Sequence, residues 1–337
     1  MGIRRTGHVR FTGQVRPHLP VPSRLVIPFG QLVNPLSQGA EGKIIMPISR
    51  RDFLKTSVAA GAIAGMGSLP LHADRAAASD LVTLGKSGVK VTRLAFGTGS
   101  KNGQVQSALG QKEFSRLVAY AYERGIRFFE TSESYTTPAM LGEALKPFPR
   151  DSYQLMSKVT TEDEGDPLKK LDELRRTSQT DYFDIMLLHW QRGTNWPNQT
   201  HQWQDAILEA QSRQTIRTHG ASVHGLPALR QVPATKWLEI AMIRVNHKGT
   251  RMDNENDDWN VPGNVSEVVN HVQQARAEGM GVISMKLVGE GTFTGHDDRQ
   301  QAMRFAFRNA GIDCATVGFK NTSEIDEAID NVNLAFV

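Results

Sequence analysis

From residue 81 onward the sequence alternates short apolar runs with longer amphipathic ones. Two short runs, Leu81–Leu84 and Lys90–Thr92, flank a turn at Lys86-Ser87-Gly88 and predict a β-hairpin. Eight later runs have the length and apolar content of buried strands: Arg93–Phe96, Arg127–Glu130, Tyr153–Lys158, Phe183–His189, Gly220–Ser222, Leu238–Arg244, Gly281–Lys286 and Cys314–Gly318. Helical patterns lie between them at Gln111–Arg124, Pro167–Thr177, Trp203–Gln211, Val265–Glu278 and Arg299–Asn309. The alternation predicts a single-domain α/β fold, a closed (β/α)8 TIM barrel preceded by the hairpin.

Two features of this pattern bear on ligand binding. No G-x-G-x-x-G turn follows any of the strands, so a Rossmann domain is not expected. Two segments without periodicity predict long loops, namely Gln191–Gln202 after the fourth strand, which holds Trp196, and Lys248–Gly263, rich in Asn, Asp and Gly. Loops at this end of a barrel form the substrate pocket.

The segment ahead of the barrel reads as an export signal. Residues 49–55 are Ser-Arg-Arg-Asp-Phe-Leu-Lys, and residues 56–73 contain no Lys, Arg, Asp or Glu. Paired arginines before a mildly apolar stretch are typical of twin-arginine (Tat) signals, and this stretch is too short and Gly/Ala-rich for a stable membrane span. We expect export by the Tat machinery to the periplasm, with cleavage after Ala73 or within Ala76–Ala78.

The chain therefore divides into three expected parts. Residues 1–45 are rich in Pro, Gly and Arg without periodicity, so we expect either a disordered leader or a true start at Met46. Residues 46–78 are the expected signal peptide and linker, and residues 79–337 the barrel.

Charge and cysteine content exclude several classes of function. Residues 1–55 carry nine Lys or Arg and two Asp or Glu, so the rest of the chain has 30 basic and 33 acidic residues. The basic character belongs to the leader, and no nucleic-acid partner is expected. The single Cys314 excludes an internal disulfide and a Cys-ligated cluster. His247 and His271 fall in a loop and a helix without ligand spacing, so no metal site is expected.

Polar residues end three successive strands of the predicted barrel. Glu130 ends the second strand, Lys158 the third and His189 the fourth, while Tyr135 lies in the loop after Glu130. Active sites of such barrels lie at the C-terminal ends of the strands. Each residue alone has an ordinary structural interpretation, but together they predict a proton-donating site. The Lys158 ammonium would lower the pKa of the Tyr135 phenol, and His189 would orient a substrate carbonyl.

The body of the chain, residues 81–330, resembles the aldo/keto reductase family. The resemblance rests on Gly125-Ile-Arg-Phe-Phe-Glu-Thr-Ser-Glu-Ser-Tyr135 with Leu141-Gly-Glu-Ala-Leu145, on Leu155-Met-Ser-Lys158, on Asp181-Tyr-Phe-Asp-Ile-Met-Leu-Leu-His189-Trp190 and on Ile283-Ser-Met-Lys286. It implies Tyr135 as general acid, Lys158 as its modulator, Glu130 in place of the family's Asp, and His189 as carbonyl orienter. It implies a reductase of aldehydes or ketones, with NADPH as the hydride donor and NADH as the other possibility.

The resemblance also implies binding residues for cofactor and substrate. The cofactor residues are Gly97, Thr98, Ser222, Lys286, Gly289, Lys320 and Glu324, and the substrate residue is Trp190. Lys320 would pair the 2′-phosphate of NADPH, whereas Glu324 suits the ribose hydroxyls of NADH.

The sequence departs from the family at the nicotinamide. Val223 replaces an Asn that would bind the amide, and Met242 and Val245 stand for a Gln and a stacking Tyr. A lost stacking ring is worth about 0.5–1.5 kcal/mol. A barrel that has lost hydride transfer and serves as an exported binding or assembly protein is therefore the alternative hypothesis.

Overall fold

The computed structural model describes residues 76–162 and 165–337 of the chain. The predicted leader, the twin arginines and the apolar signal segment lie outside the described residues. The described residues belong to one compact unit that ends at Val337.

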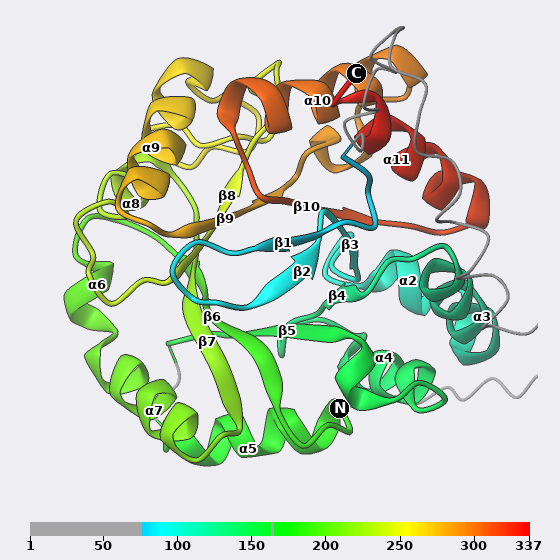
Figure 1. Ribbon diagram of the computed structural model, residues 1–337. Coiled ribbons are helices and arrows are strands. Elements are labelled where there is room, and N and C mark those ends of the chain that lie inside the picture. The colour runs from blue at the N-terminus through cyan, green and yellow to red at the C-terminus, as the bar shows by residue number, and fades with distance from the viewer. Residues whose placement is uncertain (1–75, 163–164) are drawn as a thin grey trace, which may run out of the picture. The chain divides into compact units, whose positions relative to one another are not determined.

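Eight parallel strands close into a barrel, as the alternation of runs predicted (Figure 1). The closed order is β10-β3-β4-β5-β6-β7-β8-β9, so each strand pairs with its neighbours in sequence and the last pairs with the first. The strands are β3 Leu94–Gly97, β4 Phe128–Glu130, β5 Gln154–Val159, β6 Phe183–Gln191, β7 Ile216–Val223, β8 Ile240–Arg244, β9 Gly281–Met285 and β10 Cys314–Gly318.

Helices follow the strands and form a ring outside them (Figure 1). They are α2 Gln104–Ser107, α3 Gly110–Glu123, α4 Pro138–Leu145, α5 Pro167–Thr177, α6 Trp196–Gln199, α7 His201–Ser212, α8 Leu226–Leu229, α9 Val265–Ala277, α10 His296–Phe305 and α11 Thr322–Leu334. Short 3₁₀ turns occur at η1 Arg150–Ser152 and η2 Gly289–Gly291, and α10 continues into a π-helical turn, η3 Ala306–Ala310.

The predicted hairpin covers one end of the barrel. Strands β1 Leu81–Thr83 and β2 Lys90–Thr92 pair antiparallel and cross the centre of the view in Figure 1. Leu84 and Val91 are fully buried and belong to the same hydrophobic cluster as inward-facing barrel residues such as Phe128. The hairpin thus closes the barrel end opposite the carboxyl ends of the strands.

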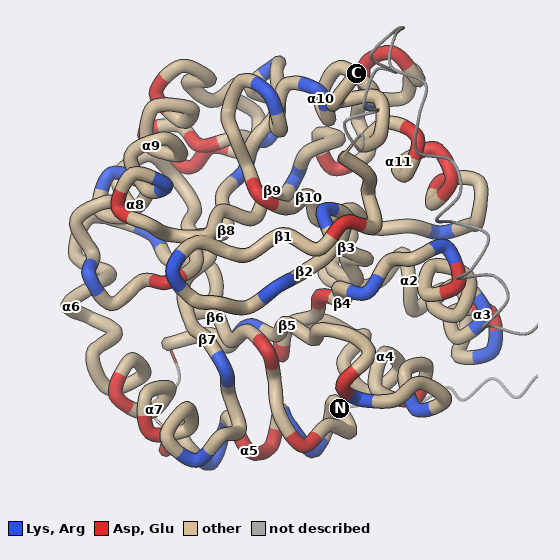
Figure 2. Tube along the Cα trace, viewed as in Figure 1, with Lys and Arg blue, Asp and Glu red and all other residues tan. Residues whose placement is uncertain are grey.

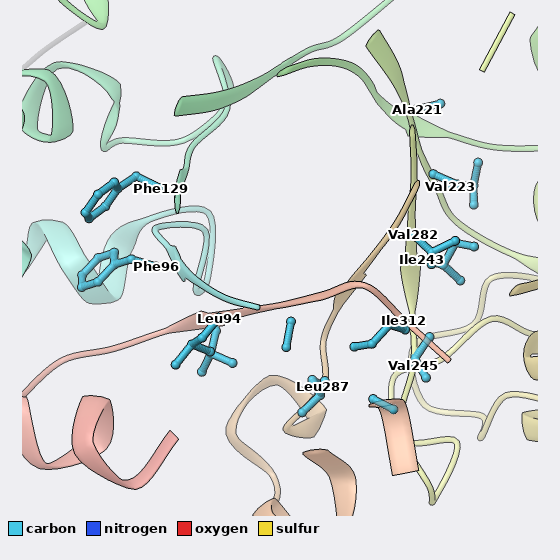
Figure 3. Packing of buried hydrophobic residues seen from close by; sticks show 14 of the residues in the cluster. Leu94, Phe96, Phe129, Ala221, Val223, Ile243, Val245, Val282, Leu287 and Ile312 are labelled. Atoms are coloured by element: carbon cyan, nitrogen blue, oxygen red, sulfur yellow. The ribbon is translucent and has the colours of Figure 1, made fainter. Parts of the chain in front are cut away.

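Alternation along the strands separates two apolar layers. Residues facing the barrel interior include Ala95, Phe128, Met156, Ile185, Leu187, Ile240, Met242, Ile283 and Met285. Their strand neighbours lie between barrel and helices. There Figure 3 shows Phe96 beside Phe129, Val223 on β7, Ile243 on β8, Val245 directly after β8, and Val282 on β9. Both faces of each strand are buried, which is why the strands appear in the sequence as continuous apolar runs.

Two predicted boundaries need correction. β7 begins at Ile216 rather than Gly220. The polar residues Arg217 and Thr218 interrupt the apolar run in the sequence, but they remain in the strand because Arg217 donates to Asp184 and Thr218 donates to Glu239. The predicted loop Gln191–Gln202 contains the short helix α6. Trp196 of that helix is buried and its Nε1 donates to the Ala228 carbonyl at 3.2 Å, so it anchors the segment to the body. The Lys248–Gly263 segment has neither helix nor strand, as predicted.

Helices α3, α5, α9 and α10 each carry residues of both charge signs, whereas α11 carries acidic residues only (Figure 2). Many of these charges are paired locally, as in Arg116 with Glu113 and Lys146 with Glu143. No helix among the described residues is long and apolar enough to cross a bilayer.

Candidate active site

The four predicted acid–base residues meet at the barrel mouth. Glu130, Lys158 and His189 share the interior face of their strands, because each is an even number of residues from Phe128, Met156 and Ile185 respectively. They therefore point inward where β4, β5 and β6 end. Tyr135 joins them from the following loop, with Lys158 Nζ 4.7 Å from its ring centroid.

Glu130 and Lys158 form a fully buried ion pair. The Lys158 ammonium also donates to the Thr131 carbonyl at 2.8 Å, and the other carboxylate oxygen of Glu130 accepts from the Thr98 backbone at 3.3 Å. Burial lowers the pKa of Lys158 well below its usual value, and the charge of Lys286 lowers it further. The barrel thus accommodates Glu130 in direct contact with the lysine.

Space for the Tyr135 phenol depends on Gly99. A Cβ placed on Gly99 would lie 2.5 Å from Cζ and 2.6 Å from the hydroxyl of Tyr135. Burial raises the pKa of Tyr135, and the charge of Glu290 raises it further. The effect of the Lys158 ammonium on this pKa stays a prediction. The phenol stays protonated at neutral pH, as a proton donor must.

His189 presents one free ring nitrogen to the mouth. Its Nδ1 lies 2.9 Å from the Ser132 hydroxyl and 3.3 Å from the Ser134 hydroxyl, while Nε2 has no partner among the described residues. Burial lowers the pKa of His189 well below its usual value, and the charges of Lys158 and Lys286 lower it further. The imidazole is therefore neutral, and its ring packs edge-on to Tyr135 at 5.7 Å between centroids.

A cleft of about 630 Å³ adjoins this site. It runs from Tyr135 and Glu130 past β9 and β10 to the N-terminal half of α11. Four of the predicted cofactor residues line it: Gly97, Lys286, Lys320 and Glu324. The predicted Gly289 precedes the lining residue Glu290 in η2.

Besides Gly289, two further predicted cofactor residues do not line the cleft. Thr98 is fully buried, and its hydroxyl donates to the Glu130 carbonyl at 2.9 Å and lies 2.8 Å from the Thr137 hydroxyl. Ser222 is also fully buried, and its hydroxyl accepts from the Trp190 backbone at 3.0 Å. Thr98 thus holds the end of β4, which carries Glu130, in place. Ser222 faces the barrel interior two residues before the mouth position of β7.

Basic side chains of the cleft are held by acids. Lys286 Nζ lies 2.5 Å from Glu290, Lys320 Nζ lies 3.5 Å from Glu324, and Arg299 pairs Glu327. Glu290 also accepts from the Lys101 backbone at 3.2 Å, so it joins the loop after β3 to the loop after β9. Sequence reasoning missed Glu290 and Arg299, because neither lies in a strand-end motif.

The cleft also offers unsatisfied polar atoms. The Thr316 hydroxyl and the Asn331 amide oxygen are buried without hydrogen-bond partners among the described residues, and both residues line it. Buried polar groups are normally hydrogen-bonded, so these atoms are positioned for a polar ligand. The cleft therefore fits a long polar molecule such as a nicotinamide dinucleotide. No cluster of metal-ligating side chains occurs in the described part of the chain.

Val223 and Val245, the positions at which the sequence departs from the family, do not reach the cleft. Both residues lie in the outer apolar layer between strands and helices, as Figure 3 shows. At the end of β8 the mouth residue is Arg244, one position before Val245, and it is buried against Asp253 and Asp257. The loss of nicotinamide contacts at the two valines stays a prediction.

Trp190, the predicted substrate residue, lies at the rim. It is 43% exposed, and its ring packs against Arg192 at 5.0 Å and edge-on to His224 at 6.3 Å. Its φ of 58° is in the left-handed region, a strained geometry that non-glycine residues adopt mainly at functional turns. His224 was not singled out from the sequence.

A parallel (β/α)8 barrel with a buried lysine–carboxylate pair, a tyrosine and a neutral histidine at its mouth defines an acid–base enzyme site beside a dinucleotide-sized cleft. Residues 93–333 match the profile of the "Aldo/keto reductase family", and this chain belongs to that family. Residues 47–67 match the profile of the TAT (twin-arginine translocation) pathway signal sequence. The predicted family and export signal are both confirmed.

Individual relatives are distant. The chain is 32% identical over 94 residues to a Glycine max protein named as a probable aldo-keto reductase, and 27% identical over 126 residues to a methylglyoxal reductase from Yersinia pestis. These segments span 27% and 36% of this chain, and 27% and 44% of the two relatives.

Solved structures share the fold at low identity. An aldo-keto reductase from Klebsiella pneumoniae, in complex with NADPH, matches with a TM-score of 0.58 at 17% identity, over 75% of this chain and 89% of that one. The holo form of an aldo-keto reductase from Bacillus halodurans matches with a TM-score of 0.59 at 17% identity, over 75% and 90%.

Proposed function

We propose that the protein reduces aldehydes or ketones with a hydride from NAD(P)H. The observation that supports this most strongly is the convergence of Glu130, Lys158, Tyr135 and His189 at one mouth beside a cleft of dinucleotide size. When bound, the cofactor supplies the hydride for the carbonyl carbon. The residues of the chain then supply orientation and the proton.

Each acid–base residue has a distinct role in this proposal. The free Nε2 of the neutral His189 donates to the carbonyl oxygen and orients it. The Tyr135 hydroxyl donates its proton to the same oxygen as negative charge develops there. Lys158 lies beside the Tyr135 ring and stabilises the phenolate that remains, and Glu130 fixes the lysine. Because burial raises the pKa of Tyr135, the proton is present at neutral pH until the oxyanion forms.

The cleft residues would bind the rest of the cofactor. Gly97 allows close approach at the nicotinamide end, because a Cβ there would lie 2.9 Å from Thr316 Cγ2 and 3.2 Å from a Glu130 oxygen. Lys286 and Gly289 would border the diphosphate, and Thr98 and Ser222 would hold the neighbouring strand ends in place. We propose NADPH as the first choice, because the Lys320–Glu324 pair is largely exposed and exchanges readily for a phosphate.

The non-catalytic alternative keeps the observation that favoured it, because Val223 and Val245 lie in the outer apolar layer and offer a nicotinamide neither an amide nor a ring. The four acid–base residues that meet at the mouth oppose it. With the mouth residues in contact and the cleft lined by polar atoms, the enzyme is the better supported function.

We further propose that the barrel acts outside the cytoplasm, in the periplasm, after export by the Tat machinery. In this division residues 1–45 form the leader, residues 46–78 the signal region and residues 79–337 the barrel. Ala78 is buried, and its backbone N–H donates to Asn333 at 2.8 Å. Signal cleavage therefore precedes Ala78 and keeps this contact.

Cofactor binding tests the proposal before any substrate is known. NADPH or NADH bound in the cleft would quench the fluorescence of Trp190 and Trp259 at the mouth. We expect saturable, micromolar binding that Tyr135→Phe leaves unchanged. Absence of binding at millimolar concentrations of both cofactors would refute the reductase and leave a barrel with another use.

A further inference from the structure

His224 occupies the mouth beside the acid–base residues. It follows β7, two residues beyond the inward-facing Ser222, and its backbone N–H donates to the Gln191 carbonyl at 2.9 Å. The β7–β8 register pairs Ser222 with Met242, so His224 stands at the level of Arg244, the mouth residue of the next strand. The proposed reaction gives His224 no role.

The His224 ring is buried without a partner for its outer nitrogen. The residue is only 9% exposed, and Nε2 is fully buried with no hydrogen bond to any described residue. A buried, unmatched ring nitrogen costs free energy unless a ligand satisfies it. Because His224 lies at the same mouth as His189 and Tyr135, we expect this ligand to be a group of the substrate rather than a separate effector.

Three basic side chains lie near His224. Burial lowers the pKa of His224 well below its usual value, and the charges of Arg244, Lys286 and Arg192 lower it further.

The acids of this region are bound to those cations. Asp253 accepts from Arg244 and from the Gly225 backbone, and Asp257 pairs both Arg244 and Arg192. Glu290 is held by Lys286. No acceptor among the described residues is therefore left for His224 Nε2, so a ligand at this position has to supply one.

Two exposed tryptophans flank this space. Trp190 is 43% and Trp259 37% exposed, although large aromatic side chains are normally covered. Trp190 lies edge-on to His224, and the Trp259 ring lies 5.2 Å from Lys286 Nζ and 5.9 Å from Arg244 Cζ. Flat apolar surface beside an unpaired N–H suits an acceptor group, such as a carboxylate, attached to an aromatic or apolar group.

We propose that His224 binds the carboxylate of the substrate, and that the substrates are 2-oxo acids with an apolar or aromatic side chain. This inference rests on the proposed carbonyl reduction. His224 Nε2–H would donate to the carboxylate, while Tyr135 and His189 hold the adjacent ketone oxygen and the tryptophans pack against the side chain. Hydride from the reduced nicotinamide adds to the ketone carbon, the Tyr135 proton adds to its oxygen, and the product is the 2-hydroxy acid with its carboxylate unchanged.

Phenylglyoxylate and its methyl ester test the charge requirement directly. Both carry the same ketone and ring, and only the first has a carboxylate. We expect kcat/KM for the acid to exceed that for the ester by about tenfold or more, as for a hydrogen bond to a charged group. His224→Phe should remove this preference by lowering kcat/KM for the acid while leaving that for the ester unchanged. His224→Gln should restore part of the preference, because its side chain supplies an N–H. His271→Phe on α9 should leave kcat/KM for both compounds unchanged. A preference for the ester, or an equal loss for both compounds in His224→Phe, would overturn the proposal.

A binding measurement separates this inference from the proposed function. Mandelate and methyl mandelate, which need no hydride transfer, are titrated into the purified chain while tryptophan fluorescence is recorded. Tighter binding of mandelate that His224→Phe weakens about tenfold supports the carboxylate site even if neither ketone is reduced. Equal binding of the two compounds, or mandelate binding unaffected by His224→Phe, refutes it even if both ketones are reduced.

Discussion

At the scale of single residues, the phenol of Tyr135 has room only because residue 99 has no side chain. Gly99→Ala would add a methyl group 2.6 Å from the Tyr135 hydroxyl and force it away from the carbonyl position. A displacement near 1 Å in an active site costs about 100-fold in rate, so we expect kcat to fall by that order with little change in cofactor affinity. Steady-state kinetics and fluorescence titration measure the two quantities.

Gly165→Ala is the matched control for this variant. A Cβ on Gly165 meets no atom within 4 Å, so its kinetics should equal those of the parent. Unchanged kcat in Gly99→Ala would show that Tyr135 does not need its present position.

In the proposed reductase, the Lys320–Glu324 pair would control the choice between the two cofactors. Glu324 faces the same end of the cleft as Lys320 and would repel a 2′-phosphate. Glu324→Gln should tighten NADPH binding about threefold to tenfold and leave NADH binding within about twofold, since a partly exposed charge pair is worth about 1 kcal/mol. Competitive fluorescence titration of the two cofactors measures the ratio. An equal change for both cofactors would place the 2′-phosphate elsewhere.

The catalytic residues could be predicted from sequence because their strands show which face is inward. Glu130, Lys158 and His189 each end a clean apolar run, and the structure brings all three together with Tyr135. His224 and Arg244 were missed for the opposite reason. Without the register between β7 and β8, nothing in the sequence distinguishes Arg244 from Val245 as the inward residue.

At the scale of elements, the β1–β2 hairpin acts on stability and not on chemistry. Leu84 is fully buried against the barrel interior, whereas Leu81 on the same hairpin is 58% exposed. Leu84→Ala should lower the free energy of unfolding by about 2–5 kcal/mol through the cavity it leaves. Leu81→Ala should change it by less than about 0.5 kcal/mol. Denaturant unfolding of both variants compares them, and equal effects would mean that the hairpin does not close the barrel.

Most elements followed from hydrophobic periodicity, and α5 has the predicted bounds Pro167–Thr177. Asp166 caps that helix through the Leu168 backbone at 2.9 Å, and Pro167 occupies its first turn, so its start signal is local. The misjudged elements depend on distant partners. β7 continues through polar residues because Asp184 and Glu239 satisfy them, and α6 is held by the Ala228 carbonyl.

At the scale of the whole molecule, buried histidines set the response to acid. Burial lowers the pKa of His189, His219, His224 and His247 in the folded protein. In the unfolded chain these histidines bind protons as the pH falls through about 6.5, whereas in the folded chain they stay neutral there. The free energy of unfolding therefore has its full value above that pH and decreases below it. We expect the free energy of unfolding to decrease between about pH 7 and pH 5, by up to about 1.4 kcal/mol per pH unit for each histidine.

His224→Phe isolates one contribution to that slope. Removing this imidazole should reduce the loss of stability between about pH 7 and pH 5. Denaturant unfolding at several pH values gives the slopes. A His224→Phe slope equal to that of the parent would mean that His224 is protonated equally in both states.

The central claim is that Tyr135 donates a proton during hydride transfer to a carbonyl. Its most direct test follows NADPH consumption by near-ultraviolet absorbance with 4-nitrobenzaldehyde, an uncharged substrate that does not depend on the His224 site. We expect aldehyde-dependent oxidation by the parent chain and a loss of about 100- to 10,000-fold in Tyr135→Phe, with NADPH binding preserved. Bound NADPH that no carbonyl oxidises, or a Tyr135→Phe variant as fast as the parent, would contradict the account.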